Sequence, residues 1–300
     1  MGNSNKCGQV CECEDLGDGA TLCIVEARPG LTKSIGKAGA SPSNTGSDNA
    51  SKAKTAGHQQ REQRPEYQYL SGVRYTGQWL GEVRDGKGVQ VWPDGAKYEG
   101  QFVDSKAAGI GRFEQADGDV YEGSWLADRA HGQGTYTQAD GARFEGQWEE
   151  DKQHGQGSEH WPDGAVYIGQ YEHGMKSGKG QFNWPNNSAY QGEFRGNGID
   201  GQGIYTWGDG RRFEGQWSMN RMHGRGHCTW PDGRTYQGQY EADKKSGTGI
   251  FTWPDGSCYE GQWYDGKQHG TGTFKAGTDR EPRKGMWEDG KRIHWIGEEE

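Results

Sequence analysis

The 300-residue sequence has few residues from which an ordinary hydrophobic core could be built. Hydrophobic types make up 30% of it, and its mean hydropathy is -1.13. A thick core of aliphatic side chains is therefore excluded. No run of about 18 apolar residues could cross a membrane as a helix, and no apolar stretch near the start suits a secretory signal. We expect a cytoplasmic protein.

Basic residues are also in deficit. The chain has 34 Lys and Arg against 43 Asp and Glu, which gives a formal net charge of -9. Residues 1–66 contain eight residues of each sign, so the acidic excess belongs to the rest of the chain. An acidic surface disfavours non-specific binding to nucleic acid and to anionic lipid. A nucleic-acid partner is therefore not expected.

The motifs of the common enzyme classes are missing. No serine lies in a Gly-x-Ser-x-Gly elbow, and the Lys and Asp set of a kinase is absent. The Gly-x-Gly pairs recur where no helix is predicted, so they do not form a phosphate-binding loop. We predict that the protein is not an enzyme and needs no cofactor.

The six cysteines do not form a disulfide framework or a common metal site. They are Cys7, Cys11, Cys13, Cys23, Cys228 and Cys258. The first four could bind zinc, but their C-x3-C-x-C spacing is not usual for it. The last two are isolated, unlike the cysteines of a secreted disulfide scaffold. We expect no metal ion.

The sequence is instead rich in glycine and aromatic residues, with 54 Gly, 13 Trp and 12% aromatic residues. A disordered chain is poor in aromatic rings, so we expect these rings to supply most of the buried area. An aromatic-x-Gly-x-aromatic pattern recurs every 23 residues, nine times without a slip. Its rings are Tyr75 and Trp79, Tyr98 and Phe102, Tyr121 and Trp125, Phe144 and Trp148, Tyr167 and Tyr171, Tyr190 and Phe194, Phe213 and Trp217, Tyr236 and Tyr240, and Tyr259 and Trp263.

Each 23-residue unit has the pattern of two short strands. Tyr121, Gly123 and Trp125 fall on one face of a strand, because successive side chains alternate between faces. A Gly-x-Gly pair and a further ring follow, and Pro-Asp-Gly then suits a turn. We predict an all-β fold, a single-layer elongated meander of consecutive β-hairpins. In it, rings from neighbouring strands lie over the bare glycines.

Three regions follow from these patterns. Residues 1–30 contain the cysteine cluster and a short apolar run, 21–25, that could form a strand. Residues 31–64 are a flexible linker, so the N-terminal segment is predicted to be largely disordered. The array covers residues 65–297, and its open end strands would favour self-association. It comprises a half-repeat at 65–72, nine repeats starting at 75, 98, 121, 144, 167, 190, 213, 236 and 259, and a degenerate terminal repeat at 283–297.

The repeat closely resembles the MORN (membrane occupation and recognition nexus) repeat. That pattern is Tyr-x-Gly-x-Trp, then His-Gly-x-Gly, then Asp-Gly, and residues 121–141 carry all of it. The family histidine is replaced in five copies, by Asp85, Ala108, Ser177, Asp200 and Ser246. The resemblance implies an elongated β-meander with an aromatic-lined groove. It also implies a scaffold role at membranes, junctions, cilia or the cytoskeleton, with lipid binding, dimerisation or capture of a partner helix.

Two sets of side chains are candidates for a site. One is the recurring histidines His131, His154, His223 and His269. Equivalent residues of adjacent hairpins lie about 9.6 Å apart, too far to share one zinc ion, so we interpret them as structural. The other set is the eighteen repeat rings given above, our candidate groove aromatics. Their exposed edges could bind an apolar helix face or a peptide, and packing in the core is the alternative.

The first residues suggest lipid attachment, with Gly2 as a myristoylation site and Cys7 as a palmitoylation site. Lys6 stands where the myristoylation motif needs Ser or Thr.

We predict a non-enzymatic scaffold that binds protein partners, including helical or peptide-like segments or a second copy of itself. We expect it in the cytoplasm, peripheral at a membrane or associated with the cytoskeleton or a cilium. The alternative is a peripheral membrane protein, which binds anionic phospholipid or is tethered by N-terminal acylation.

Overall fold

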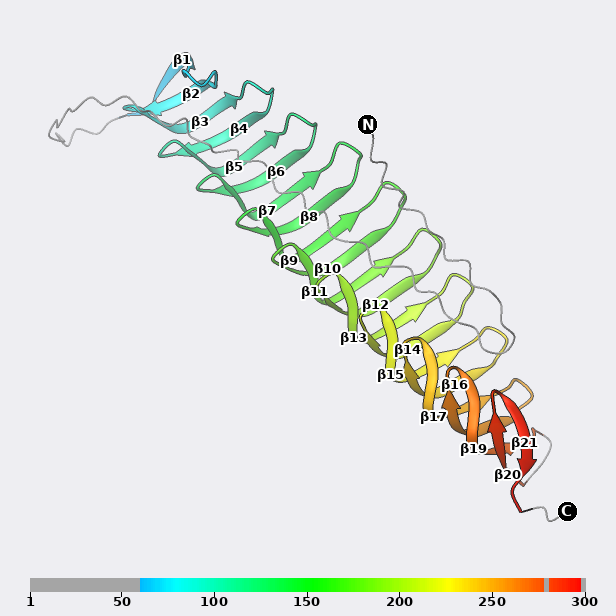
Figure 1. Ribbon diagram of the computed structural model, residues 1–300. Helices are drawn as coiled ribbons and strands as arrows, with labels where there is room; N and C mark the ends of the chain where they lie inside the picture. Colours follow the sequence, from blue (N-terminus) through cyan, green and yellow to red (C-terminus); the bar gives the residue numbers. More distant parts are fainter. Residues whose placement is uncertain (1–59, 278–280, 298–300) are drawn as a thin grey trace. The chain divides into compact units, whose positions relative to one another are not determined.

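The computed structural model describes residues 60–277 and 281–297, and every regular element in these residues is a β-strand. They divide into two compact units, which we call the N-terminal unit (up to Gly178) and the C-terminal unit (from Lys179). Within each unit, consecutive strands lie side by side in chain order (Figure 1). Each pairs antiparallel with the next, as in β4–β5 and β16–β17. The predicted all-β meander is confirmed.

The strands alternate between seven and nine residues through the nine repeats. The N-terminal unit contains β1 (Glu62–Gln68), β2 (Arg74–Leu80), β3 (Val83–Val91), β4 (Lys97–Val103), β5 (Lys106–Glu114), β6 (Val120–Leu126), β7 (Arg129–Thr137), β8 (Arg143–Glu149), β9 (Lys152–His160) and β10 (Val166–Glu172). β11 (Met175–Asn183) contains the boundary between the units. The C-terminal unit contains β12 (Ala189–Arg195), β13 (Gly198–Thr206), β14 (Arg212–Ser218), β15 (Arg221–Thr229), β16 (Thr235–Glu241), β17 (Lys244–Thr252), β18 (Cys258–Tyr264), β19 (Lys267–Lys275), β20 (Arg283–Glu288) and β21 (Lys291–Trp295).

The Trp-Pro-Asp-Gly segments form the turns between hairpins. In the turn before β4, the Gly95 N–H donates to Trp92 O at 3.0 Å, and the Ala96 N–H donates to Asp94 Oδ1 at 3.0 Å. Gly95 has a φ of 94°, which a residue with a side chain rarely adopts. Aspartate and glycine are therefore needed at these positions for different reasons, one as an acceptor and the other for its backbone conformation.

A second turn, within each hairpin, has only two residues. Asp104 and Ser105 connect β4 to β5 with φ values of 48° and 65°. Positive φ at both central positions is typical of the type I′ turn, whose twist matches that of the flanking strands. Ala127 and Ala242 occupy the first position of the same turn in other repeats, with φ values of 49° and 47°. Alanine carries no turn signal, so the sequence did not reveal these turns.

Each ring-glycine motif builds the core around a pair of facing glycines. Gly77 of β2 lies opposite Gly88 of β3, and the ring of Tyr75 lies over both. A Cβ added to Gly77 would lie 2.6 Å from Tyr75 Oη, so only glycine fits. The Tyr75 hydroxyl donates to Gln78 O at 2.9 Å. The ring therefore comes from the neighbouring strand for Gly88, as predicted, and from the same strand for Gly77.

Rings of successive hairpins contact one another edge to face. Tyr75 lies 5.2 Å from Trp79 and 5.1 Å from Phe102 of the next hairpin, with interplanar angles of 85° and 84°. Such pairs are stabilising beyond the area that they bury. Burial, the largest cause, also raises the pKa of Tyr75 from 10.0 to about 12, which opposes ionisation of its phenol. The core is therefore a row of aromatic rings along one face of the sheet.

The two end strands are interrupted. The pairing of β1 with β2 shifts register between Arg64 and Tyr67, around Pro65, which has no backbone N–H. The pairing of β20 with β21 shifts between Met286 and Trp287. Bulges and proline at edges hinder the addition of a further strand. Self-association, which the sequence suggested, stays a prediction.

Candidate partner-binding groove

The face of the sheet opposite the rings carries polar side chains, and in the C-terminal unit it contains an open groove. The groove has a volume of about 1010 Å³. The backbone of four glycines of the facing pairs contributes to its floor. Strands β14 to β19 line it with Glu214, Arg225, Gly226, His227, Gln237, Gly238, Gln239, Thr248, Gly249, Ile250, Glu260, Gly261, Gln262 and Thr271.

Glutamines after the first glycine of the repeat stabilise a bulge beside this groove. The register of β16 with β17 shifts between Gly238 and Gln239, and Gly247 opposite has a φ of 59°. Gln239 Oε1 occupies the space where a Gly247 Cβ would lie and accepts the Thr248 N–H at 2.8 Å. The side chain therefore takes up a backbone donor that the bulge removes from the ladder.

The same arrangement recurs in the hairpins on either side. Gln216 Oε1 accepts the Arg225 N–H at 2.8 Å, and Gln262 Oε1 accepts the Thr271 N–H at 3.0 Å. In each case the amide oxygen faces the backbone, so the Nε2 group is directed away from it. Three consecutive repeats therefore present an amide donor group at the same position of the polar face.

Two charged side chains of the groove have no ion pair within the described residues. These are Arg225 and Glu260, on β15 and β18. Glu214, in contrast, pairs with Arg212 at 2.8 Å. Arg225 and Glu260 are therefore available to a charged partner.

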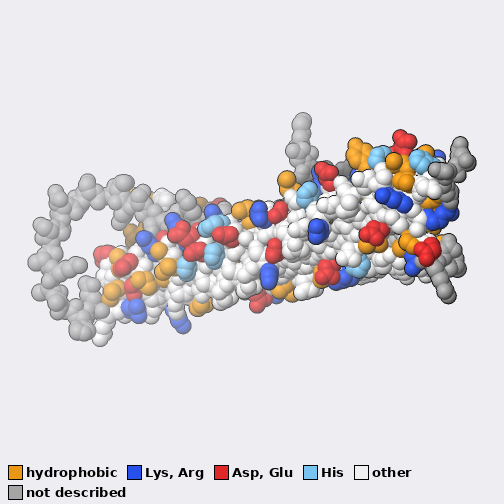
Figure 2. Space-filling model, turned by 90° about the horizontal axis from the view of Figure 1, so that it is seen from below, with side chains coloured by type: hydrophobic (Ala, Val, Ile, Leu, Met, Phe, Trp, Pro, Cys, Tyr) orange, Lys and Arg blue, Asp and Glu red, His pale blue; other side chains and the backbone are white. Residues whose placement is uncertain are grey.

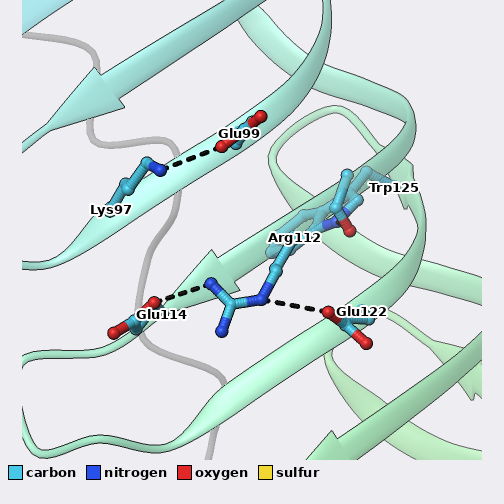
Figure 3. A network of polar contacts seen from close by, with 7 residues as sticks. Lys97, Glu99, Arg112, Glu114, Glu122 and Trp125 are labelled. Atoms are coloured by element: carbon cyan, nitrogen blue, oxygen red, sulfur yellow. Dashed lines mark hydrogen bonds and ion pairs between the residues drawn. The ribbon is translucent and has the colours of Figure 1, made fainter.

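On the polar face of the N-terminal unit, in contrast to the groove, charged side chains form ion pairs with one another. Arg112 contacts Glu114 at 2.6 Å and Glu122 at 3.0 Å, and Lys97 contacts Glu99 at 2.9 Å (Figure 3). The hydrogen bond from Lys97 lowers the pKa of Glu99, as a stabilised carboxylate requires. Acidic and basic side chains are also interspersed on the face seen in Figure 2. Exposed pairs of this kind contribute little to stability, and here they balance the local charge.

The eighteen candidate groove aromatics lie elsewhere. All of them are buried, and the most exposed, Trp263, retains 7% of its surface. They form the core on the opposite face, which is the alternative that the sequence left open, and none lines the groove. The polar residues between the rings line the groove instead. In the sequence these residues look like the solvent-exposed face of any strand, so the pattern did not indicate that they line a groove.

The recurring histidines are separate side chains at the surface or partly buried. His223 and His269 are exposed, and His154 lies 3.3 Å from Glu149. No group of three or more His, Cys, Asp or Glu that could hold a metal ion occurs in residues 60–277 and 281–297. His227, which the sequence did not single out, is the histidine that lines the groove.

The acylation candidates Gly2 and Cys7 lie outside the described residues, as does the short strand proposed at 21–25. Among the residues that the structure describes, no helix is long and apolar enough to cross a membrane.

The repeated hairpins, with aromatic rings packed on one face of the sheet, define a β-repeat protein. The MORN repeat family model matches nine segments that together cover more than half of the chain. They are residues 75–97, 98–120, 121–143, 144–166, 167–189, 190–211, 213–233, 236–258 and 259–277. The chain therefore belongs to the MORN repeat family, as its sequence predicted.

Curated proteins provide no match to this sequence. Among solved structures, the chain is similar to the TCP domain of SAS-4 (dCPAP) of Drosophila melanogaster in complex with a proline-rich motif of Ana2 (dSTIL). Identity is 14%, the TM-score is 0.33, and the match covers 65% of this chain and 98% of that one. A mutant TCP10 domain of Danio rerio CPAP matches at 13% identity and a TM-score of 0.24, over 78% and 99% of the two chains. Likeness at this level supports no conclusion about what the chain binds.

Proposed function

We propose that the protein is a scaffold that binds a segment of a protein partner in the groove of its C-terminal unit. The single observation that carries this proposal is the difference between the two faces of the sheet. The repeat rings are buried in the core on one face, while the polar face has an open groove in which Arg225 and Glu260 form no ion pair within the described residues. Family membership supports a scaffold or interaction role in general.

The arrangement favours binding rather than catalysis. A catalytic site needs a nucleophile or an acid–base pair at hydrogen-bonding distance, with a perturbed pKa. Most of the raised pKa values in this structure belong to buried tyrosines of the core, where burial is the largest cause. None of these tyrosines lines the groove.

Blocking the groove tests the proposal. Gln237 is exposed and lines the groove, so Gln237→Trp should fill it without disturbing the core. Gln191 is exposed at the equivalent position of β12, outside the groove, and Gln191→Trp is the matched control. Proteins captured from a cell extract by the wild type should be lost with Gln237→Trp and retained with Gln191→Trp. Identical capture by all three would contradict a role of the groove.

We further propose that the protein is cytoplasmic and reaches a membrane or the cytoskeleton through its bound partner. Fluorescence microscopy of the full chain tests this location. Under this proposal, Gln237→Trp releases the protein from the structure where it accumulates, and Gly2→Ala does not. Release by Gly2→Ala alone would instead indicate attachment through an acyl group.

A further inference from the structure

Two glutamines that line the groove, Gln239 and Gln262, form a regular ladder of amide donors with Gln216, which lies beside the groove. Gln216, Gln239 and Gln262 occupy the same position of three consecutive hairpins, and each points its Oε1 at a backbone N–H of the next strand. Strands are spaced about 4.8 Å apart, so equivalent side chains of consecutive hairpins repeat every 9.6 Å or so. The Nε2 groups therefore present hydrogen-bond donors at a pitch of about 9.6 Å across the strands.

A polyproline II helix has a matching pitch. It rises about 3.1 Å per residue with three residues per turn, so equivalent carbonyl groups repeat about every 9.3 Å. Its backbone makes no internal hydrogen bonds, which leaves these carbonyls free to accept. Proline has no N–H, so a proline-rich segment presents acceptors alone to a ladder of donors. We propose that the groove binds a proline-rich segment of a partner in the polyproline II conformation.

Other backbone conformations fit the ladder less well. An α-helix uses its carbonyls within the helix, except in the last turn. An extended strand repeats about every 6.7 Å, out of step with the donors. It would also need a free sheet edge, whereas the groove lies on a face where the backbone groups of β15 to β18 are already paired.

The charges of the groove add a preference for the residues beside the prolines. Arg225 on β15 and Glu260 on β18 are three strands apart and offset by two residues along the strands, which separates them by about 16 Å. A polyproline II helix covers that length in about five residues. The fitting ligand therefore has an acidic residue over Arg225, a short run of prolines, and a basic residue over Glu260. This assignment rests on the proposed function, because it names the partner of the same groove.

One repeat of the chain has a glutamate at the glutamine position. It shows how the amide donor can be removed without damage to the fold. Glu193 stands at the glutamine position of another repeat, and its Oε2 accepts the Gln202 N–H at 3.1 Å. Glutamate therefore preserves the bond to the bulge while removing the Nε2 donor. The double substitution Gln239→Glu with Gln262→Glu removes two adjacent donors of the ladder. Gln147→Glu is the control in the N-terminal unit, where Gln147 Oε1 accepts the Gln156 N–H at 2.8 Å.

The test measures binding of four fluorescent peptides to the full chain by anisotropy. The probes are Glu-Pro-Pro-Pro-Pro-Lys, its charge variant Lys-Pro-Pro-Pro-Pro-Lys, an extended Glu-Val-Thr-Val-Thr-Lys, and a helical peptide of Glu, Ala and Lys. The proline peptide should bind most tightly. The double substitution should weaken it roughly tenfold or more, given the contribution of two hydrogen bonds, while Gln147→Glu leaves it unchanged. Arg225→Glu should weaken binding of this peptide and strengthen that of Lys-Pro-Pro-Pro-Pro-Lys.

The possible failures are distinguishable. One outcome is that the extended or helical peptide binds more tightly than the proline peptide and that the double substitution abolishes this binding. The ligand assignment is then overturned, and the scaffold function stands. Equal binding of the proline peptide to the wild type and the double variant also overturns the assignment. If no peptide binds while Gln237→Trp still abolishes protein capture, only the proline-rich assignment falls. If neither effect is seen, both proposals fall.

Discussion

Lys176 Nζ lies 2.8 Å from Glu159 Oε2 within the N-terminal unit, and neither side chain is exposed to solvent. The hydroxyl of Tyr171 also donates to Glu159 Oε2, at 3.0 Å, and the Lys176 ammonium lies 4.9 Å from the centre of the Trp161 ring. Glu159 occupies a position at which most repeats have a ring, such as Phe113. The core therefore accommodates an ion pair only because each charge has its partners.

Removing one member of this pair should be costly. Lys176→Ile leaves Glu159 buried without its cation, and such changes destabilise by about 3–5 kcal/mol. Chemical denaturation measured by tryptophan fluorescence would give the loss. The double variant with Glu159→Phe reproduces the pair Phe182 and Ile199 found at the same positions of the next repeat. It should regain most of the loss, because well-packed apolar residues often replace a buried ion pair without cost. A double variant as unstable as the single one would contradict this account.

The second turn residue connects neighbouring hairpins through its carboxylate. Asp151 Oδ1 accepts the Ala130 N–H at 2.8 Å, and the Asp151 N–H donates to Ala130 O at 3.1 Å. Burial, the largest cause, raises the pKa of Asp151 above its ordinary 3.8. The charge is therefore unfavourable to folding at neutral pH. The stability that protonated Asp151 contributes is therefore fully present below the unfolded-state pKa. It is lost as the pH rises through the raised folded-state pKa.

Asp151→Asn should therefore stabilise the protein slightly at pH 7, and this advantage should disappear on acidification below about pH 4. Asn220 already makes the equivalent bond to the Ile199 N–H, at 2.6 Å, so the amide fits. Asp151→Ala removes the acceptor and should cost about 1–3 kcal/mol at either pH. Thermal unfolding followed from pH 3 to pH 7 would distinguish the two variants. An Asn variant less stable than wild type at pH 7 would argue against the burial effect.

Facing glycines should tolerate no side chain. A Cβ on Gly100 would lie 2.6 Å from the Gly111 Cα, which is backbone and cannot rotate away. We expect Gly100→Ala to destabilise by about 3 kcal/mol or more, at the upper end of overpacking. Gly164 is the control, since nothing lies within 4 Å of its added Cβ and only its φ of 91° is unfavourable. Gly164→Ala should cost about 1–2 kcal/mol in denaturant unfolding. Equal costs would show that strain, rather than contact, explains these glycines.

The two-residue turns offer a stabilising change. Ala242 has a φ of 47°, a region that asparagine tolerates better than alanine. Ala242→Asn should raise the free energy of unfolding by about 0.5–1 kcal/mol. Asp104 has the same conformation, with a φ of 48°, and is already suited to it, so Asp104→Asn should have no effect. A gain at both positions or at neither would contradict the conformational explanation.

The sequence predicted those features that every repeat has in common. The exact 23-residue period of the rings and glycines indicated paired short strands, and the structure confirms them. The Lys176–Glu159 pair was not predicted, because its members are 17 residues apart and meet only after the hairpins stack. Glu159 in place of a ring was the signal for it. The role of Gln239 was also missed, because a glutamine on a strand face is usually solvated, and the bulge that it stabilises arises from strand pairing.

The central claim is that partners bind the polar face of the C-terminal unit, opposite the aromatic core. Photo-crosslinking tests it most directly, with a photoreactive residue placed at Thr248 in the groove or at the exposed turn residue Asp232. We expect partner crosslinks from position 248, few from position 232, and loss of the former in the Gln239→Glu and Gln262→Glu variant. Crosslinks from position 232 alone would contradict the claim, whereas crosslinks from 248 that persist in the variant would contradict only the role of the amide donors.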